Sequence, residues 1–198
     1  VPLLSSTFDR LRRTSEGGSD LRAYHLNDDA VTAFVAMLNR ASRGSFAFVF
    51  DSLLFNALEA AGGDVEDERV DRLLRKRDTP AAADLLAQEQ LLFAVNVPET
   101  PEVCGHWYFI QASRTHAHIV DVDSCGGAHP QAIAVVQRFL EALHVQAAAT
   151  ANQPVSEFFT AGWRSGSLGA TVLGANRSPQ QPDWVSCGVY MLVGIWCC

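Results

Sequence analysis

The stretch that most constrains this chain is the apolar run that follows Cys187-Gly188 near the C-terminus. Residues 189–196 carry no charge and are almost all hydrophobic. A helix without a polar face belongs in a core, so we expect a buried helix that begins at Cys187. Unpaired backbone N–H groups at a helix start favour negative charge and would stabilise a thiolate. Cys187 is therefore a candidate nucleophile, although this stretch alone fits a packing cysteine better.

Composition indicates a globular protein and excludes several classes of function. The chain has 198 residues, of which 48% are hydrophobic, which is enough for one core. A net charge of -7 argues against nucleic acid as the main partner. No stretch resembles a signal peptide or a membrane span, so no membrane partner is expected. Five cysteines without paired spacing fit a reducing compartment, the cytoplasm or nucleus, or a host cell for a viral or bacterial protein.

The order of predicted elements indicates an α+β fold with one sheet. We expect residues 1–20 to form a loosely ordered lead-in and residues 21–198 to form one monomeric domain. Helical spacing of apolar residues predicts helices over residues 28–43, 51–61 and 64–78 and a fourth from His129 to a small-residue connector over residues 147–154. Short apolar runs predict strands over residues 91–97, 107–110 and 118–122, with a weaker one near residues 171–173.

Polar residues that flank two of these strands suggest the chemistry. His106 directly precedes one strand and Asp123 follows the next, so a hairpin would bring them together. A thiolate nucleophile needs a base, and the base needs an orienting acceptor; His106, Asp123 and Cys187 supply these types. Asp121, on the same strand face, is the rival acceptor. The Gln181 amide is a candidate donor to an oxyanion beside the Cys187 backbone N–H.

Taken in this order, the motifs resemble the Ulp/SENP-type cysteine proteases of the CE clan, which process SUMO and related ubiquitin-like proteins. The resemblance covers roughly residues 21–190. Its matching segments are Leu26-Asn27-Asp28, Phe48-Val49-Phe50-Asp51-Ser52, Leu92-Phe93-Ala94-Val95-Asn96, His106-Trp107, Asp123-Ser124, Pro179-Gln180-Gln181-Pro182 and Cys187-Gly188-Val189-Tyr190. The resemblance implies a papain-like fold with a central, mostly antiparallel sheet flanked by helices. It also implies catalysis by His106, Asp123, Gln181 and Cys187.

The resemblance further implies hydrolysis after the C-terminal Gly-Gly of SUMO or a related modifier, through a thioester and without metal or cofactor. Trp107 would line a narrow groove that only glycine can thread, because glycine lacks a Cβ. The family usually carries a tryptophan where this chain has His25, so His25 or its neighbour Tyr24 is expected to cover the tail. The predicted substrate-binding residues are Trp107, His25, Tyr24, Asp28 and Gln180.

Other functions of the same triad remain open at this point. Viral maturation proteases use it to cut polyproteins at glycine-containing sites, and bacterial effector acetyltransferases use it with coenzyme A. A binding module that has lost turnover is a third alternative. Asp123 and the run Gln180-Gln181-Pro182 favour the modifier protease. Ser186 stands where the family commonly carries aspartate, which is a departure outside the triad.

Overall fold

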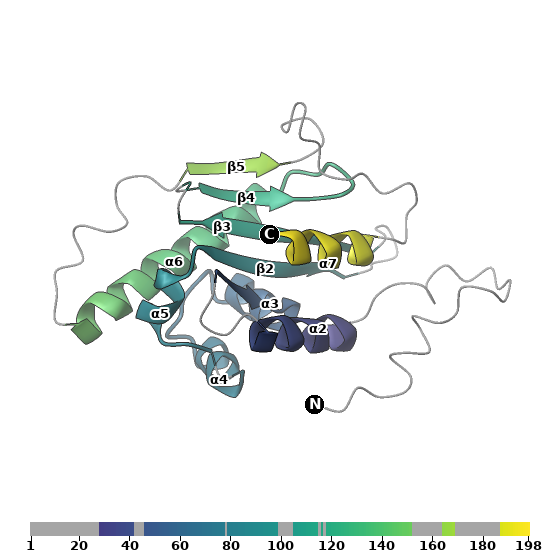
Figure 1. Ribbon diagram of the computed structural model, residues 1–198. Coiled ribbons are helices and arrows are strands. Elements are labelled where there is room, and N and C mark those ends of the chain that lie inside the picture. Colours follow the sequence, from purple (N-terminus) through teal and green to yellow (C-terminus); the bar gives the residue numbers. More distant parts are fainter. Residues whose placement is uncertain are drawn as a thin grey trace, which may run out of the picture.

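The computed structural model describes residues 28–41, 46–77, 79–98, 105–114, 116, 118–151 and 187–198, and the backbone of residues 164–168. The predicted lead-in and the strand predicted near residues 171–173 lie outside this part. Helices cover both faces of one central sheet, as expected for an α+β fold (Figure 1). Among the described helices, none combines the length and the apolar character that crossing a lipid bilayer requires.

The sheet is mixed and has the strand order β1-β2-β3-β4-β5. Its strands are β1 (Ala47–Phe50), β2 (Gln90–Val97), β3 (His106–Ser113), β4 (His118–Val122) and β5 (Arg164–Leu168). The central strands β2, β3 and β4 are antiparallel, and β1 and β5 add in parallel at the two edges. The predicted hairpin of β3 and β4 is confirmed, with Phe109 opposite Val122. The sequence did not predict β1 or β5 as strands.

Side chains alternate across the sheet and build a separate core on each face. On one face, Leu91, Phe93 and Val95 of β2 pack with α3 (Ser52–Ala60), α4 (Glu68–Lys76), α5 (Ala82–Ala87) and α6 (Pro130–Ala151). On the other face, Leu92 and Ala94 pack with α2 (Asp28–Ala41) and α7 (Cys187–Cys197). The sheet therefore lies between two helical layers, with α6 behind it and α7 in front in Figure 1.

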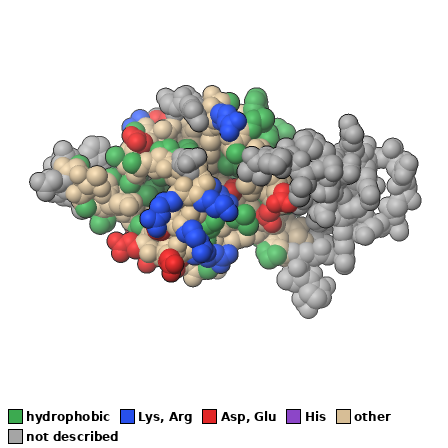
Figure 2. All heavy atoms as spheres, turned by 90° about the horizontal axis from the view of Figure 1, so that it is seen from below, with side chains coloured by type: hydrophobic (Ala, Val, Ile, Leu, Met, Phe, Trp, Pro, Cys, Tyr) green, Lys and Arg blue, Asp and Glu red, His purple; other side chains and the backbone are tan. Residues whose placement is uncertain are grey.

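The helices on the α6 side largely follow their sequence signals. Asp67 caps α4, which buries Val70 and carries its charges outward, as the dipole-complementary pattern predicted. Figure 2, which views the molecule from below, shows basic and acidic side chains close together on that surface. The connector predicted from residue 147 is wrong, because α6 continues to Ala151. Alanine has the highest helix propensity, so this small-residue segment prolongs the helix.

Helix α7 is buried on one face only, which corrects the expectation of a helix without an exposed side. Cys187, Gly188, Met191 and Ile195 are buried, whereas the exposed fractions of Val189, Val193 and Trp196 are 52%, 53% and 64%. A Cβ added at Gly194 would lie 2.6 Å from a ring carbon of Phe109 in β3. Glycine at this position therefore lets α7 approach the sheet closely.

Candidate active site

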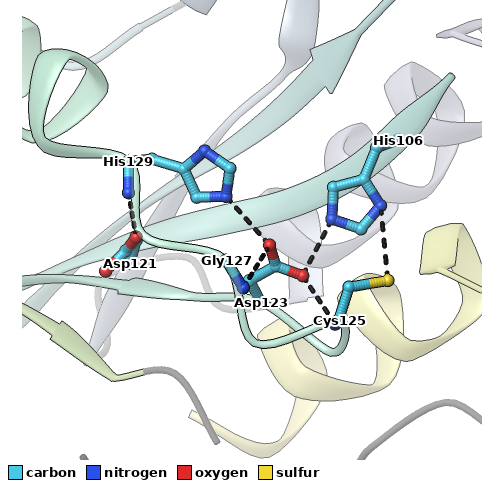
Figure 3. Close-up of polar contacts among 6 residues, drawn as sticks. All are labelled: His106, Asp121, Asp123, Cys125, Gly127 and His129. Carbon is cyan, nitrogen blue, oxygen red and sulfur yellow. Dashed lines mark hydrogen bonds and ion pairs between the residues drawn. The ribbon is translucent and has the colours of Figure 1, made fainter. Parts of the chain in front are cut away.

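The pairing of β3 with β4 brings His106 and Asp123 to the same end of these two strands. His106 is the first residue of β3, and Asp123 directly follows the last residue of the antiparallel strand β4. His106 Nε2 lies 2.8 Å from Asp123 Oδ1 (Figure 3). The hairpin thus places an imidazole and a carboxylate in hydrogen-bond contact, as the sequence predicted.

The Asp123 carboxylate accepts four hydrogen bonds. Oδ1 accepts hydrogen bonds from His106 Nε2 and, at 2.7 Å, from the backbone N–H of Cys125. Oδ2 accepts hydrogen bonds from His129 Nε2 at 2.9 Å and from the backbone N–H of Gly127 at 3.2 Å. Burial alone would raise the pKa of Asp123, but the hydrogen bonds from His106, His129 and Cys125 hold it well below its usual range. An ionised carboxylate only accepts, so both imidazoles carry their proton on Nε2.

The His106 imidazole also contacts the candidate nucleophile. Burial lowers the pKa of His106, whereas the hydrogen bonds with Asp123 and Cys187 and the charges of both groups raise it, to about 9. Cys187 is 2% exposed and stands at the start of α7, where backbone N–H groups are unpaired within the helix. His106 therefore interacts with an orienting carboxylate and with a thiol, which is the arrangement that nucleophilic catalysis by cysteine requires.

A second thiol lies near the same imidazole, which sequence reasoning did not anticipate. The Sγ of Cys125 is 3.9 Å from His106 Nδ1, and Cys125 is exposed in the turn after β4 (Figure 3). Two cysteines therefore compete for the role of nucleophile on geometric grounds. Of these two cysteines, only Cys187 both contacts His106 and stands at the N-terminus of a helix, which stabilises a thiolate.

The rival carboxylate Asp121 serves a different purpose. It is fully buried, and its Oδ2 accepts the backbone N–H of His129 at 2.6 Å. Within the described part of the chain, its Oδ1 has no hydrogen-bond partner. Of the two candidate acceptors, it is Asp123 that meets His106.

The other predicted site residues lie as follows. Trp107 is 2% exposed and packs in the core beneath α7 with Cys187 and Phe109. The carboxylate of Asp28 accepts hydrogen bonds from Ser52 and Asn96, which ties the start of α2 to α3 and β2. The predicted residues outside the described part are Gln181, Gln180, His25 and Tyr24.

His129 is the site residue that sequence reasoning missed, because it was interpreted only as the start of a helix. Ligand atoms of His106, Asp123 and His129 all lie within 4.8 Å of one another, a spacing that a metal site also needs. In the arrangement described above, both imidazoles instead donate hydrogen bonds to the Asp123 carboxylate.

Comparison with known proteins decides the family. Residues 24–198 match the profile of the Ulp1 protease family, C-terminal catalytic domain. The chain belongs to the Ulp1 protease family. The predicted Ulp/SENP-type resemblance and the papain-like α+β fold of this family are thereby confirmed. No curated protein matches the chain in a sequence comparison.

Solved structures of Ulp1 proteases share the fold. The C-terminal Ulp1 protease domain in complex with Smt3, the yeast ortholog of SUMO, has a TM-score of 0.61 at 15% identity, covering 99% of this chain and 84% of that one. The Chaetomium thermophilum Ulp1-like SUMO protease catalytic domain has a TM-score of 0.59 at 17% identity, covering 100% and 79%. The SUMO protease Ulp1 with its catalytic cysteine oxidised to a sulfonic acid has a TM-score of 0.59 at 16% identity, covering 86% and 64%. At these identities, the likeness concerns the fold alone.

Proposed function

We propose that this Ulp1-family chain is a thiol protease and isopeptidase that cleaves after the C-terminal Gly-Gly of SUMO or a related ubiquitin-like protein. The observation that carries the proposal is the position of His106, whose imidazole contacts both the Asp123 carboxylate and the Cys187 thiol. Membership of the family and a related Ulp1 structure that contains Smt3 support the choice of modifier. A thiol nucleophile also fits a reducing intracellular compartment.

The chemistry follows from these three side chains. The Cys187 thiolate attacks the carbonyl carbon of the terminal glycine, and the proton on His106 passes to the leaving amine, which gives a thioester. His106 then removes a proton from a water molecule that attacks the thioester and releases the modifier. Asp123 keeps the imidazole oriented and stabilises its charged form. Backbone N–H groups at the start of α7 are suited to bind the oxyanion.

The first experiment identifies the nucleophile. SUMO carrying a C-terminal aldehyde or vinyl electrophile is incubated with the wild type, Cys187→Ser and Cys125→Ser. We expect covalent labelling of the wild type and Cys125→Ser but not of Cys187→Ser. Cys125→Ser is the matched control because its thiol also lies near His106. Loss of labelling in Cys125→Ser alone would transfer the nucleophile to Cys125.

The second experiment tests the modifier and the alternatives. The same electrophile is attached to ubiquitin, and labelled acetyl-coenzyme A is offered separately. We expect the SUMO-type probe to label the enzyme and the other two reagents to leave it unlabelled. Labelling by ubiquitin alone would contradict the SUMO assignment, and acetyl transfer would indicate the effector-type acetyltransferase. A wild type that binds SUMO without reacting would be the inactive binding module.

Gln181 remains the predicted side-chain donor to the oxyanion. Gln181→Ala is expected to lower kcat by about 10²–10³-fold, the usual effect of removing one oxyanion donor. KM should change little, because the donor acts mainly on the transition state. Steady-state kinetics on a modifier-tail substrate measure both constants. A rise in KM with kcat unchanged would make Gln181 a substrate-positioning residue instead.

A further inference from the structure

We propose that His129 is a positioning residue for the triad: its imidazole holds Oδ2 of Asp123, so that Oδ1 stays directed at His106. The inference rests on the proposed function, in which Asp123 orients His106. Figure 3 shows the two imidazoles on opposite sides of the one carboxylate. Asp123 thus binds two histidines: His106, which is hydrogen-bonded to the Cys187 thiol, and His129, which binds the other carboxylate oxygen.

The four donors are divided evenly between the two oxygens. Oδ1 has His106 and one backbone N–H, and Oδ2 has His129 and one backbone N–H. If the imidazole at Oδ2 were lost, that oxygen would keep only the Gly127 N–H, which is the longest of the four contacts at 3.2 Å. The carboxylate would then be free to turn about its last torsion, and the hydrogen bond to His106 would lose its fixed direction.

His129 is itself held from three sides. Its backbone N–H donates to Asp121 Oδ2 at 2.6 Å, and its carbonyl accepts the backbone N–H of Ile133 at 3.1 Å in the first turn of α6. Its ring stacks on Tyr108, with centroids 3.7 Å apart and planes inclined by 9°. A side chain fixed in this way can impose its own position on Asp123.

The backbone at Gly127 lies close to both members of the pair formed by Asp123 and His129. A Cβ added at Gly127 would lie 2.5 Å from Asp123 Oδ2 and 3.0 Å from His129 Nε2. Asp123 is 1% exposed, so water does not replace a missing donor easily. At this buried position each oxygen of the Asp123 carboxylate needs hydrogen-bond donors from the protein, and His129 supplies one of the two for Oδ2.

Two substitutions separate the hydrogen bond from the packing. His129→Phe keeps a ring against Tyr108 but removes the donor, whereas His129→Gln loses the ring and retains an N–H at a similar reach. We expect His129→Phe to lower kcat roughly 10- to 100-fold with KM unchanged, as for the loss of one hydrogen bond to a charged group. His129→Gln should recover most of the activity. Thermal melting of both variants shows that each is folded.

A double-mutant cycle tests whether His129 acts through Asp123. His129→Phe is added to Asp123→Ala, in which the acceptor no longer exists. We expect no further loss of kcat, because the role of His129 has already been removed. A full additional loss would overturn the proposal, and so would wild-type activity in His129→Phe or equal losses in the Phe and Gln variants.

A readout without the modifier keeps this inference distinct from the proposed function. In the Cys125→Ser background, iodoacetamide alkylates Cys187 at a rate that reports the thiolate that His106 stabilises. We expect slower alkylation at neutral pH in His129→Phe than in His129→Gln. If no modifier is cleaved but this difference appears, the proposed substrate fails and the positioning role stands. Equal alkylation rates would overturn the positioning role even in an active SUMO protease.

Discussion

The basic limb of the pH profile of kcat/KM tests the pair formed by His106 and Asp123. Burial lowers the pKa of His106, while the hydrogen bonds and charges of Asp123 and Cys187 raise it from 6.5 to about 9. In the proposed mechanism the imidazolium is the active form, so activity is present below this pKa and is lost as the pH rises through about 9. Asp123→Asn removes the charge and is expected to shift the basic limb down toward 6.5.

The size of the effect separates protonation from orientation. At about pH 7.5, a pKa of about 9 leaves roughly 97% of the imidazole charged, whereas a pKa of 6.5 leaves roughly 10%. Lost protonation therefore explains about a tenfold fall at that pH. The comparable amide substitution in a serine-protease triad costs about 10⁴ in kcat. Most of the expected loss thus comes from orientation, and this part persists at low pH where both enzymes are protonated.

The assay is kcat/KM on a modifier-tail substrate from about pH 6 to about pH 10, a range that includes both pKa values. Asp121→Asn is the matched control, because Asp121 is buried on the adjoining strand β4 and binds the His129 backbone, not the His106 ring. Its basic limb should stay near 9. An unshifted limb in Asp123→Asn would refute the assignment of the orienting carboxylate, and a limb shifted only in Asp121→Asn would transfer that role to Asp121.

Two further predictions concern the packing that supports the site. Gly194→Ala should lower stability by about 1–3 kcal/mol and reduce kcat, because the new methyl group would overlap Phe109 and displace α7; unchanged melting and activity would contradict the close approach. Arg77→Ala should cost roughly 1.5–3 kcal/mol in urea unfolding, since its Nε lies 2.5 Å from the buried carboxylate of Asp51. Arg75→Ala, which removes an exposed ion pair, should cost less than about 1 kcal/mol, and equal losses would show that burial of the Arg77 pair is unimportant.

The parts of the fold that sequence predicted are those with a local signal. Strands β2, β3 and β4 are apolar runs bounded by turns, and the hairpin that joins the last two is closed within a few residues. His106 and Asp123 flank this hairpin, so their contact follows from its register. The order of acidic and basic residues that predicted the helix around α4 is likewise a local signal.

The missed features depend on contacts between distant segments. Strand β5 consists of Arg-Ser-Gly-Ser-Leu, which has little strand propensity and pairs in parallel with β4. Strand β1 likewise pairs in parallel with β2, although the three helices α3, α4 and α5 separate the two strands in the chain. His129 stands beside a helix start in the sequence, and only the stacking on Tyr108 and the bond to Asp123 distinguish it from an ordinary first-turn residue. No pattern in its neighbours indicates either contact.

Strand β3 links the two halves of the proposed machinery. Its first residue, His106, is hydrogen-bonded to Asp123 at one end of the strand. The next residue, Trp107, points to the opposite face of the sheet and packs with Cys187. The base and its carboxylate therefore arise from one local hairpin, but the thiol reaches them only when α7 lies against Trp107 and Phe109. Truncating Trp107 would for this reason disturb the distance between thiol and base as well as the core. The buried position of Trp107 thus connects the packing of α7 on the sheet with the chemistry of His106 and Asp123.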